Sequence, residues 1–375
     1  MDFNFTSEQD LLRDSLQRYL QDAYDFPTRE ATIKGEAGWR PEVWKAFAEE
    51  LGILAAPFPE ELGGLGGGAV DTLVIMETLG GALVVEPFLE TVVLAGGVLK
   101  RLGGDLAADL IGKIIAGEAT FAFAHNEPEV RYGLAEVSLE AVQNGDGWTL
   151  SGVKDAVNAA PWASHLLVTA RTAGARGERA GVSLFLVEAG AKGLALSTYP
   201  TVDGGRAADI RFDGVPAVLL GEAGKGLDLL EPAVDEATAA VCAEALGVMR
   251  RLHADTLDYA KQRKQFGLPL AAFQVLQHRM VDMFIAIEQA VSITYMATMK
   301  LEKPAAERAR AISAAKVRVG KSCREVGQSA IQIHGGMGMT MELAVSHYFK
   351  RATVLEQMFG GIDHHLSRFE SLPAG

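Results

Sequence analysis

The hydrophobic pattern of the chain changes period twice, and this change limits the folds that the chain can adopt. Apolar residues recur every three to four positions up to about residue 118, alternate in twos from 119 to 221, and regain the helical period from about 222. The last part contains four long helical runs, at roughly 227–262, 270–301, 304–332 and 341–370. We therefore predict an α+β protein of three domains: an all-helical domain over 1–118, a middle β domain with a barrel-like pair of sheets over 119–221, and a C-terminal four-helix bundle over 222–375.

Local signals support this division. Ser7 is predicted to cap a first helix, and Pro41 is predicted to open a second one, at a position where its missing N–H does no harm. Asn144-Gly145-Asp146-Gly147 predicts a β-hairpin, because these residues tolerate the positive φ that tight turns need. The predicted strands cover 135–142, 148–152, 165–171, 182–187 and 209–212.

The composition excludes several classes of function. A formal net charge of −13 argues against nucleic acid as a partner, because phosphate binding needs a basic face. The two cysteines, Cys242 and Cys323, are expected to be unpaired thiols, and no ligand set at metal-site spacing predicts a metal. The start of the chain has no basic segment followed by an apolar run, and we identified no membrane-spanning stretch. We therefore expect a cytoplasmic protein.

Two stretches carry residues suited to a cofactor. In the first, Tyr259–Met283, Gly267 and Pro269 interrupt a helical pattern just after Arg263, Gln265 and Phe266. A cation and an aromatic ring at a helix–turn junction suit an anionic, ring-bearing cofactor, whereas the plain alternative is an exposed Arg and a core Phe at a helix end. The second stretch, 332–338, reads QIHGGMG, and its glycines would let a backbone approach a pyrophosphate.

The sequences of these stretches resemble those of the acyl-CoA dehydrogenase family. The resemblance is carried by R-x-Q-F-G-x-P and F-Q-x-x-Q-x-x-x-x-D-M in the first stretch and by Q-I-x-G-G-x-G in the second. It implies FAD held across a dimer interface, with one group of residues contacting one site and a second group approaching a site from the neighbouring chain. The first group is Arg263, Gln265 and Phe266, and the second is Gln332, Gly335, Gly336 and Gly338.

The resemblance also implies a reaction, the oxidation of an acyl-CoA thioester to a 2-enoyl-CoA, with electron-transfer flavoprotein as the acceptor. The family's usual base lies in R-D-A-x-x-x-x-x-Y-E-G, and the matching stretch here, 351–361, places Gly360 at the base position. Some branches place the base on the first helix of the bundle instead, at a position that falls on Ala237. A slip of one residue makes Glu236 the candidate base, and Glu244 and Asp363 are lesser candidates.

The segments that the family places beside the flavin depart from its pattern. Its T-E-P segment appears as Asn126-Glu127-Pro128, and its W-I-T-N-G segment appears as residues 156–160, with Asn158 in place of Ser or Thr. Asn126 and Asn158 are therefore candidate flavin contacts. This uneven pattern resembles the small-subunit chains of α2β2 heterotetramers of the pimeloyl-CoA dehydrogenase type, which often act on bulky or dicarboxylic acyl groups, including steroid side chains.

Three interpretations remain open from the sequence. The chain is an acyl-CoA dehydrogenase subunit whose base is Glu236 or comes from a partner, a non-catalytic partner that only completes an FAD site, or a flavin monooxygenase on the same fold. The acyl group and the choice between homotetramer and heterotetramer are left open.

Overall fold

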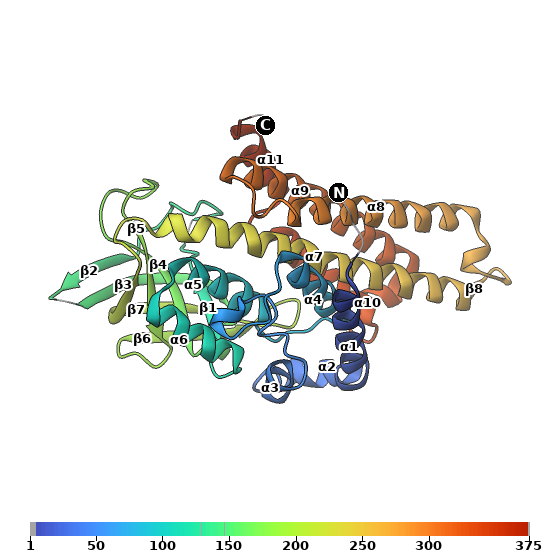
Figure 1. Ribbon diagram of the computed structural model, residues 1–375. Helices are drawn as coiled ribbons and strands as arrows, with labels where there is room; N and C mark the ends of the chain where they lie inside the picture. The colour runs from blue at the N-terminus through green and yellow to red at the C-terminus, as the bar shows by residue number, and fades with distance from the viewer. Residues whose placement is uncertain (1–4, 129, 146, 374–375) are drawn as a thin grey trace. The chain divides into compact units, whose positions relative to one another are not determined.

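The computed structural model describes residues 5–128, 130–145 and 147–373, which form two compact units. One unit is helical and combines Met1–Lys34, Ala69–Val84 and Thr238–Gly375. The other contains the β-sheet and combines Gly35–Gly68 with Val85–Ala237. Figure 1 labels most of the α-helices and β-strands of both units. The units are not consecutive along the chain, because segments from the first hundred residues belong to each of them.

The helical unit is built around long helices that pack side by side. Its helices are α1 (Ser7–Ala23), α2 (Phe26–Lys34), α4 (Ala69–Ala82), most of α7 (Gly226–Gln262), α8 (Gln274–Thr298), α9 (Ala305–His334), α10 (Ala344–Gln357) and α11 (Ile362–Ser371). Helix α9 packs against α8, α10 and α11. Helices α4 and α7 approach closely at glycines: a Cβ on Gly247 would lie 1.9 Å from the carbonyl oxygen of Glu77, so no larger residue fits there.

The β unit is a closed sheet with helices beside it. The strands are β1 (Phe121–Ala124), β2 (Glu140–Asn144), β3 (Gly147–Asn158), β4 (His165–Arg171), β5 (Val182–Glu188), β6 (Leu194–Pro200) and β7 (Arg206–Leu220). Pairings β4–β2, β2–β3, β3–β7, β7–β5 and β5–β4 form a complete circuit, which makes the sheet a barrel. Its interior is apolar, with Leu150, Leu166 and Phe185 fully buried. The helical elements of this unit are α3 (Pro41–Glu49), η1 (Glu60–Leu62), the π-helix η2 (Leu89–Ala95), α5 (Gly96–Leu102), α6 (Gly104–Ile115), η3 (Ala160–Trp162) and the start of α7.

The order of helical, β and helical segments is as predicted, and so is the hairpin, in which Asn144 pairs with Gly147. Asp146 of its turn lies outside the described residues. Strands β1 and β6 were not predicted, and β3 and β7 are longer than expected because both continue through register shifts that interrupt the alternation.

Two local predictions were wrong. The cap of α1 is Thr6 rather than Ser7: the Thr6 hydroxyl accepts a hydrogen bond from the Gln9 N–H at 3.3 Å, and the Gln9 side chain accepts one from the Thr6 N–H. The last predicted helix, 341–370, is two helices, α10 and α11. The break falls at Phe359 and Gly360, whose φ angles of 55° and 121° are incompatible with a continuing helix.

Candidate functional site

The two predicted cofactor stretches of the helical unit lie next to each other. Tyr259, near the end of α7, stacks on His334, the last residue of α9, with ring centroids 4.2 Å apart and an interplanar angle of 23°. The Tyr259 hydroxyl also donates to the carbonyl oxygen of His334 at 3.5 Å. Arg263 follows Tyr259 by one helical turn, and Gly335 follows His334 directly. This stack therefore brings together segments that are about seventy residues apart in the sequence.

A small hairpin presents the aromatic residue of the first stretch. Strands β8 (Lys264–Gln265) and β9 (Leu268–Pro269) pair across a two-residue turn in which Phe266 has φ 52° and Gly267 has φ 79°. Positive φ at both central residues is the geometry of a type I′ turn, and it is unusual for a Phe. Phe266 is 93% exposed, so it does not belong to the core. The alternative of a core Phe at a helix end is therefore wrong.

The polar and glycine residues around this turn are equally open. Arg263 is exposed and has no ion pair with another described residue. Apart from its chain neighbours, a Cβ built on Gly335 or Gly336 would meet no atom of a described residue within 4 Å, whereas one on Gly338 would lie 3.0 Å from the Cβ of His334. Packing within the chain thus explains Gly338 but not Gly336. The space beside Gly335 and Gly336 is free for a ligand or another chain, which fits a backbone cradle for a phosphate.

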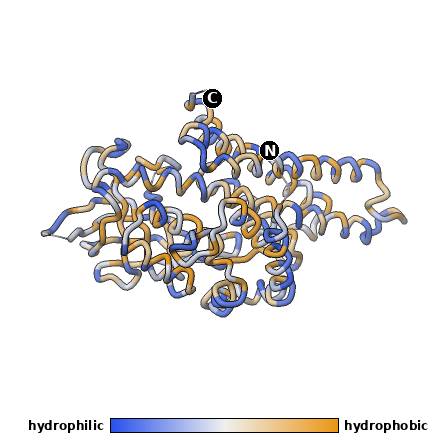
Figure 2. The backbone as a smooth tube through the Cα atoms, viewed as in Figure 1, coloured by the Kyte–Doolittle hydropathy of each residue, from blue (hydrophilic) through white to orange (hydrophobic). Residues whose placement is uncertain are grey.

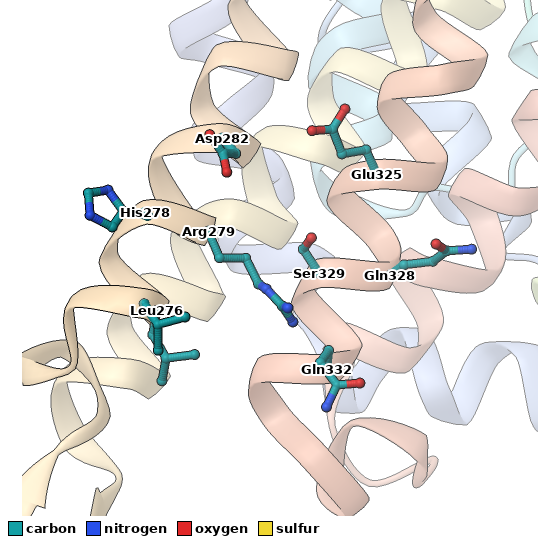
Figure 3. A pocket seen from close by; sticks show the side chains of 9 residues that line it. Leu276, His278, Arg279, Asp282, Glu325, Gln328, Ser329 and Gln332 are labelled. Atoms are coloured by element: carbon teal, nitrogen blue, oxygen red, sulfur yellow. The ribbon is translucent and has the colours of Figure 1, made fainter.

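A groove of about 830 Å³ between α8 and α9 adjoins the second stretch (Figure 3). Its lining is mixed, with apolar side chains near the start of α8 and polar side chains along both helices. The lining residues are Val275, Leu276, His278, Arg279, Asp282, Glu325, Gln328, Ser329 and Gln332. The half-buried Arg279 points toward Ser329 and Gln332 in the close-up. The predicted cofactor residue Gln332 therefore lies exposed in a groove rather than packed in the bundle.

In the β unit, the structure brings together the segments that carry Asn126 and Asn158. Asn126 follows β1, Asn158 ends β3, and both are exposed. The carbonyl oxygen of Asn126 accepts a hydrogen bond from the Asp155 N–H at 2.8 Å. Between Asp155 and Asn158, β3 bulges, and Ala156 takes a left-handed φ of 48°. The Asp209 carboxylate stabilises this bulge by accepting from the Ala156 N–H at 3.0 Å.

The candidate bases on α7 are engaged in ion pairs. Glu236 forms a two-point ion pair with Arg101, with oxygen–nitrogen distances of 2.6 and 3.2 Å. Glu244 is buried and forms a similar pair with Arg351 at 2.6 and 2.8 Å. Both oxygens of each carboxylate accept hydrogen bonds from an arginine, so both groups are engaged within the chain. Asp363 lies exposed in the first turn of α11.

The usual base position is shaped around glycine. Gly360 is buried, and a Cβ there would lie 2.5 Å from the ring of His364 and 2.8 Å from Nε2 of His365. The buried Lys316 donates to the carbonyl oxygens of Gly360 and Glu356 at 2.9 and 2.8 Å. Burial and the nearby Lys316 charge lower the pKa of His365 to about 3, which makes this His a poor proton acceptor near neutral pH.

Two further findings concern predictions from composition. Both cysteines are buried free thiols. Among the described residues one helix, α8, is long and apolar enough to cross a membrane by length and composition alone. This is weak support for a span, because a core or interface helix of a soluble protein passes the same test.

Comparisons with known proteins gave matches along most of the chain. Three family models match it in order: "Acyl-CoA dehydrogenase, N-terminal domain" over residues 6–117, "Acyl-CoA dehydrogenase, middle domain" over 122–215 and "Acyl-CoA dehydrogenase, C-terminal domain" over 224–368.

One relative and two solved structures match over nearly their full length. Acyl-CoA dehydrogenase FadE27 of Mycobacterium tuberculosis is 28% identical, covering 98% of this chain and 97% of its own. The crystal structure of the ChsE4-ChsE5 complex from Mycobacterium tuberculosis is similar with a TM-score of 0.89 and 27% identity over 100% of both chains. The FAD complex of PigA is similar with a TM-score of 0.89 and 26% identity over 98% of both chains.

Proposed function

Because the chain belongs to the acyl-CoA dehydrogenase family, we propose that it is one subunit of an FAD-dependent acyl-CoA dehydrogenase in which a second chain supplies the catalytic base. The reaction is the α,β-dehydrogenation of an acyl-CoA thioester to a 2-enoyl-CoA. The observation that carries the proposal is the contrast between an open cofactor surface around Phe266 and a base position at Gly360 that has no room for a side chain.

The cofactor residues of the helical unit serve the FAD of a neighbouring chain. The exposed Arg263 pairs with the pyrophosphate, and the exposed Phe266 covers a ring of the cofactor. From the neighbouring chain, Gln332, Gly335 and Gly336 offer an amide and backbone N–H groups to the same site. These groups point outward and have no role in the core, which supports a ligand shared between chains. When bound, FAD supplies the two-electron acceptor that the reaction requires.

The exposed face of α8 supports a partner chain. Val275, Val281, Phe284 and Ile285 are 48–70% exposed on a helix whose most apolar window is only 39% buried, and hydrophobic and hydrophilic residues alternate along it (Figure 2). An apolar face of this kind is typical of an obligate subunit interface. The groove beside it contains Gln332, so a chain covering α8 would also enclose the cofactor surface.

The base comes from the partner chain on this proposal. Glu236 and Glu244 are tied to Arg101 and Arg351, and Gly360 carries no side chain. In this chain Asn126 and Asn158 contact the flavin and fix its orientation toward the thioester. The likeness to the ChsE4-ChsE5 complex supports an assembly of two related chains, and an α2β2 heterotetramer is the form we favour over a homotetramer. Electron-transfer flavoprotein is the proposed acceptor, and the proposed location is the cytoplasm.

One observation favours a second candidate function. The chain is also similar to the structure of PigA with FAD and proline, at 26% identity and a TM-score of 0.88. Proline is not a CoA thioester. The alternative is therefore a flavin enzyme that acts on a free small molecule, such as a flavin monooxygenase. Bleaching of the flavin by CoA thioesters without oxygen supports the dehydrogenase. Oxygen-dependent turnover with reduced flavin and no response to CoA thioesters supports the alternative.

The cofactor surface is tested by replacing Arg263 with alanine and measuring FAD affinity by flavin fluorescence. Loss of one charge-assisted phosphate contact is expected to weaken binding by roughly tenfold or more. Lys261→Ala is the matched control, because it removes one exposed positive charge two residues away. Equal affinities of the two variants, in the chain alone and in its assembly, would contradict the proposed role of Arg263.

A further inference from the structure

We propose that Lys154 is the positioning residue of the flavin-facing loop and holds Asn126 in place from both sides. The inference rests on the proposed function, in which Asn126 contacts FAD. Lys154 lies on β3 and is fully buried. Burying a charged group costs free energy unless the group is paired, so a lysine here calls for an explanation beyond packing.

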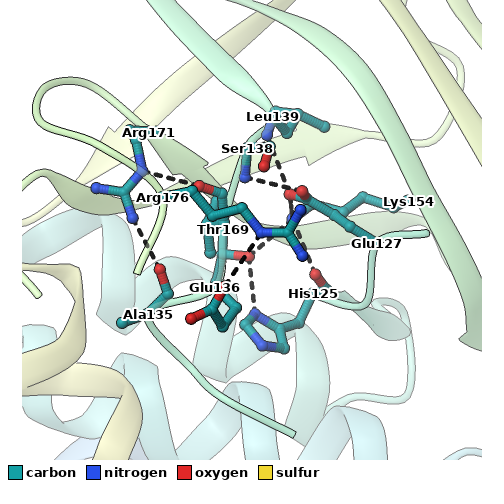
Figure 4. Close-up of polar contacts among 11 residues, drawn as sticks. His125, Glu127, Ala135, Glu136, Ser138, Leu139, Lys154, Thr169, Arg171 and Arg176 are labelled. Atoms are coloured by element: carbon teal, nitrogen blue, oxygen red, sulfur yellow. Dashed lines mark hydrogen bonds and ion pairs between the residues drawn. The ribbon is translucent and has the colours of Figure 1, made fainter. Parts of the chain in front are cut away.

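Two of the three hydrogen bonds of the Lys154 ammonium run to the residues that flank Asn126 (Figure 4). Nζ donates to the carbonyl oxygen of His125 at 2.9 Å and to the Glu127 carboxylate at 2.7 Å. The third bond runs to the Thr169 hydroxyl at 3.0 Å. An ammonium has three donors, and all three are used. The residues before and after Asn126 are thus fixed by the same nitrogen atom.

Asn126 is held at a third point while its side chain is exposed. Its carbonyl oxygen accepts from the Asp155 N–H at 2.8 Å, next to Lys154 in the same strand. His125 and Glu127 are 5% and 7% exposed, whereas Asn126 between them is exposed. The chain therefore turns one side chain outward between two anchored ones. Because Asp155 also leads into the bulge before Asn158, the same anchor orders both predicted flavin contacts.

Glu127 extends the anchor to the end of the loop. Its two carboxylate oxygens accept from the backbone N–H groups of Ser138 and Leu139 at 2.8 and 3.0 Å. The Nδ1 atom of His125 lies 3.0 Å from the Thr169 hydroxyl. Through these contacts one buried ion pair closes both ends of the segment between β1 and β2.

The charge of Lys154 survives its burial. Burial lowers the pKa of Lys154 to about 8, and the Glu127 carboxylate opposes that shift. Near neutral pH the ammonium keeps its three donors. A buried ion pair is a weak source of stability, since apolar side chains of similar volume often serve as well. Fixing the direction of a polar loop is a role that apolar side chains cannot take over.

The test compares Lys154→Met with Leu150→Ala. Leu150 is also fully buried on β3, so its truncation weakens the same barrel without touching the Asn126 anchor. The readouts are FAD affinity, the visible spectrum of the bound flavin, and hydrogen exchange of the backbone N–H groups around residues 125–128 in the FAD-free chain. For Lys154→Met we expect an affinity loss of about tenfold, a shifted flavin spectrum and faster exchange in that segment. Leu150→Ala is expected to leave all three readouts near those of the unaltered chain.

The inference is overturned if both variants, at similar losses of stability, show the same affinity, spectrum and local exchange. Thr169→Val provides a second variant should Lys154→Met fail to fold, because it keeps the shape and removes one partner of the ammonium. It is expected to weaken FAD binding several-fold, and unchanged binding and exchange in this variant would count against the anchor. If no assembly of the chain binds FAD, the proposed function fails, while the exchange measurement still decides whether Lys154 orders the loop.

Discussion

Replacing Gly360 by alanine is expected to destabilise the helical unit by about 3 kcal/mol, a magnitude that follows from two costs. Gly360 has φ 121°, and a non-glycine residue in such a region costs about 1–3 kcal/mol. The added Cβ would also lie 2.5 Å from the His364 ring and 2.8 Å from Nε2 of His365, and overpacking of this kind costs about 1–3 kcal/mol. Rotation of the partly exposed His364 relieves part of the second cost but none of the first.

The assay is urea unfolding at neutral pH, with Gly361→Ala as the matched control. Gly361 has an ordinary φ of −77°, and its added Cβ would meet only the movable end of Gln357, so we expect a loss below about 1 kcal/mol. The slope of free energy against urea should stay unchanged in both variants. Gly360→Ala combined with His364→Ala should recover only the part of the steric loss that comes from the His364 ring, because the contact with His365 remains. Equal stabilities of Gly360→Ala and Gly361→Ala would refute the reasoning.

Three further predictions follow from the same contacts. His365 has a pKa of about 3 in the folded state and about 6.5 in the unfolded chain, so it destabilises the fold as pH falls from 6.5 toward 3. At pH 5 this residue should lower the free energy of unfolding by about 2 kcal/mol. Urea unfolding should therefore show a smaller difference between pH 7 and pH 5 in His365→Gln than in the unaltered chain. Arg351→Met should cost about 3–5 kcal/mol because it leaves Glu244 buried and unpaired, and the double variant with Glu244→Gln should recover part of that loss; an unaltered melting temperature in Arg351→Met would contradict the pair. Phe266→Ser should change the free energy of unfolding by less than about 0.5 kcal/mol because the ring is 93% exposed, yet weaken FAD binding; a large loss of stability would instead assign Phe266 to the core.

The sequence predicted the elements whose pattern is periodic and missed features set by tertiary contacts. The long runs of α7, α8 and α9 and the hairpin at Asn144–Gly147 follow from spacing and turn chemistry, and the structure contains them. The cap at Thr6 was misplaced by one residue, because Ser and Thr give the same signal and the choice depends on which hydroxyl reaches the Gln9 N–H.

The break before α11 and the contacts of Lys154 show more clearly what cannot be predicted from the sequence. A Phe-Gly pair inside an apolar repeat resembles a continuing helix until the positive φ angles of Phe359 and Gly360 are known. Lys154 is buried on β3, and its partners, Glu127 and Thr169, are distant in sequence. Nothing local predicts that contact. The exposure of Phe266 could not be predicted either, because a Phe after Arg and Gln is compatible with a position in the core or on a ligand-binding surface.

For the candidate site, the sequence predicted the candidate cofactor and base residues, and the structure shows which of them are exposed and which form ion pairs. Arg263 and Gln332 were selected from separate stretches, and the Tyr259–His334 stack shows that these two stretches lie next to each other. Glu236 was selected by its place on α7, but its ion pair with Arg101 depends on a residue more than a hundred positions away. Such a pair becomes visible only once the chain is folded.

We propose above all that this chain binds FAD, the cofactor of acyl-CoA dehydrogenases, but does not supply its own catalytic base. The most direct measurement is an anaerobic titration with CoA thioesters, followed at the visible flavin bands, of the chain alone and of the chain purified with a second acyl-CoA dehydrogenase chain. We expect no bleaching of any flavin bound by the chain alone and full bleaching in the two-chain assembly. Stoichiometric bleaching of the chain alone, abolished by Glu236→Gln, would contradict the claim and identify Glu236 as the base.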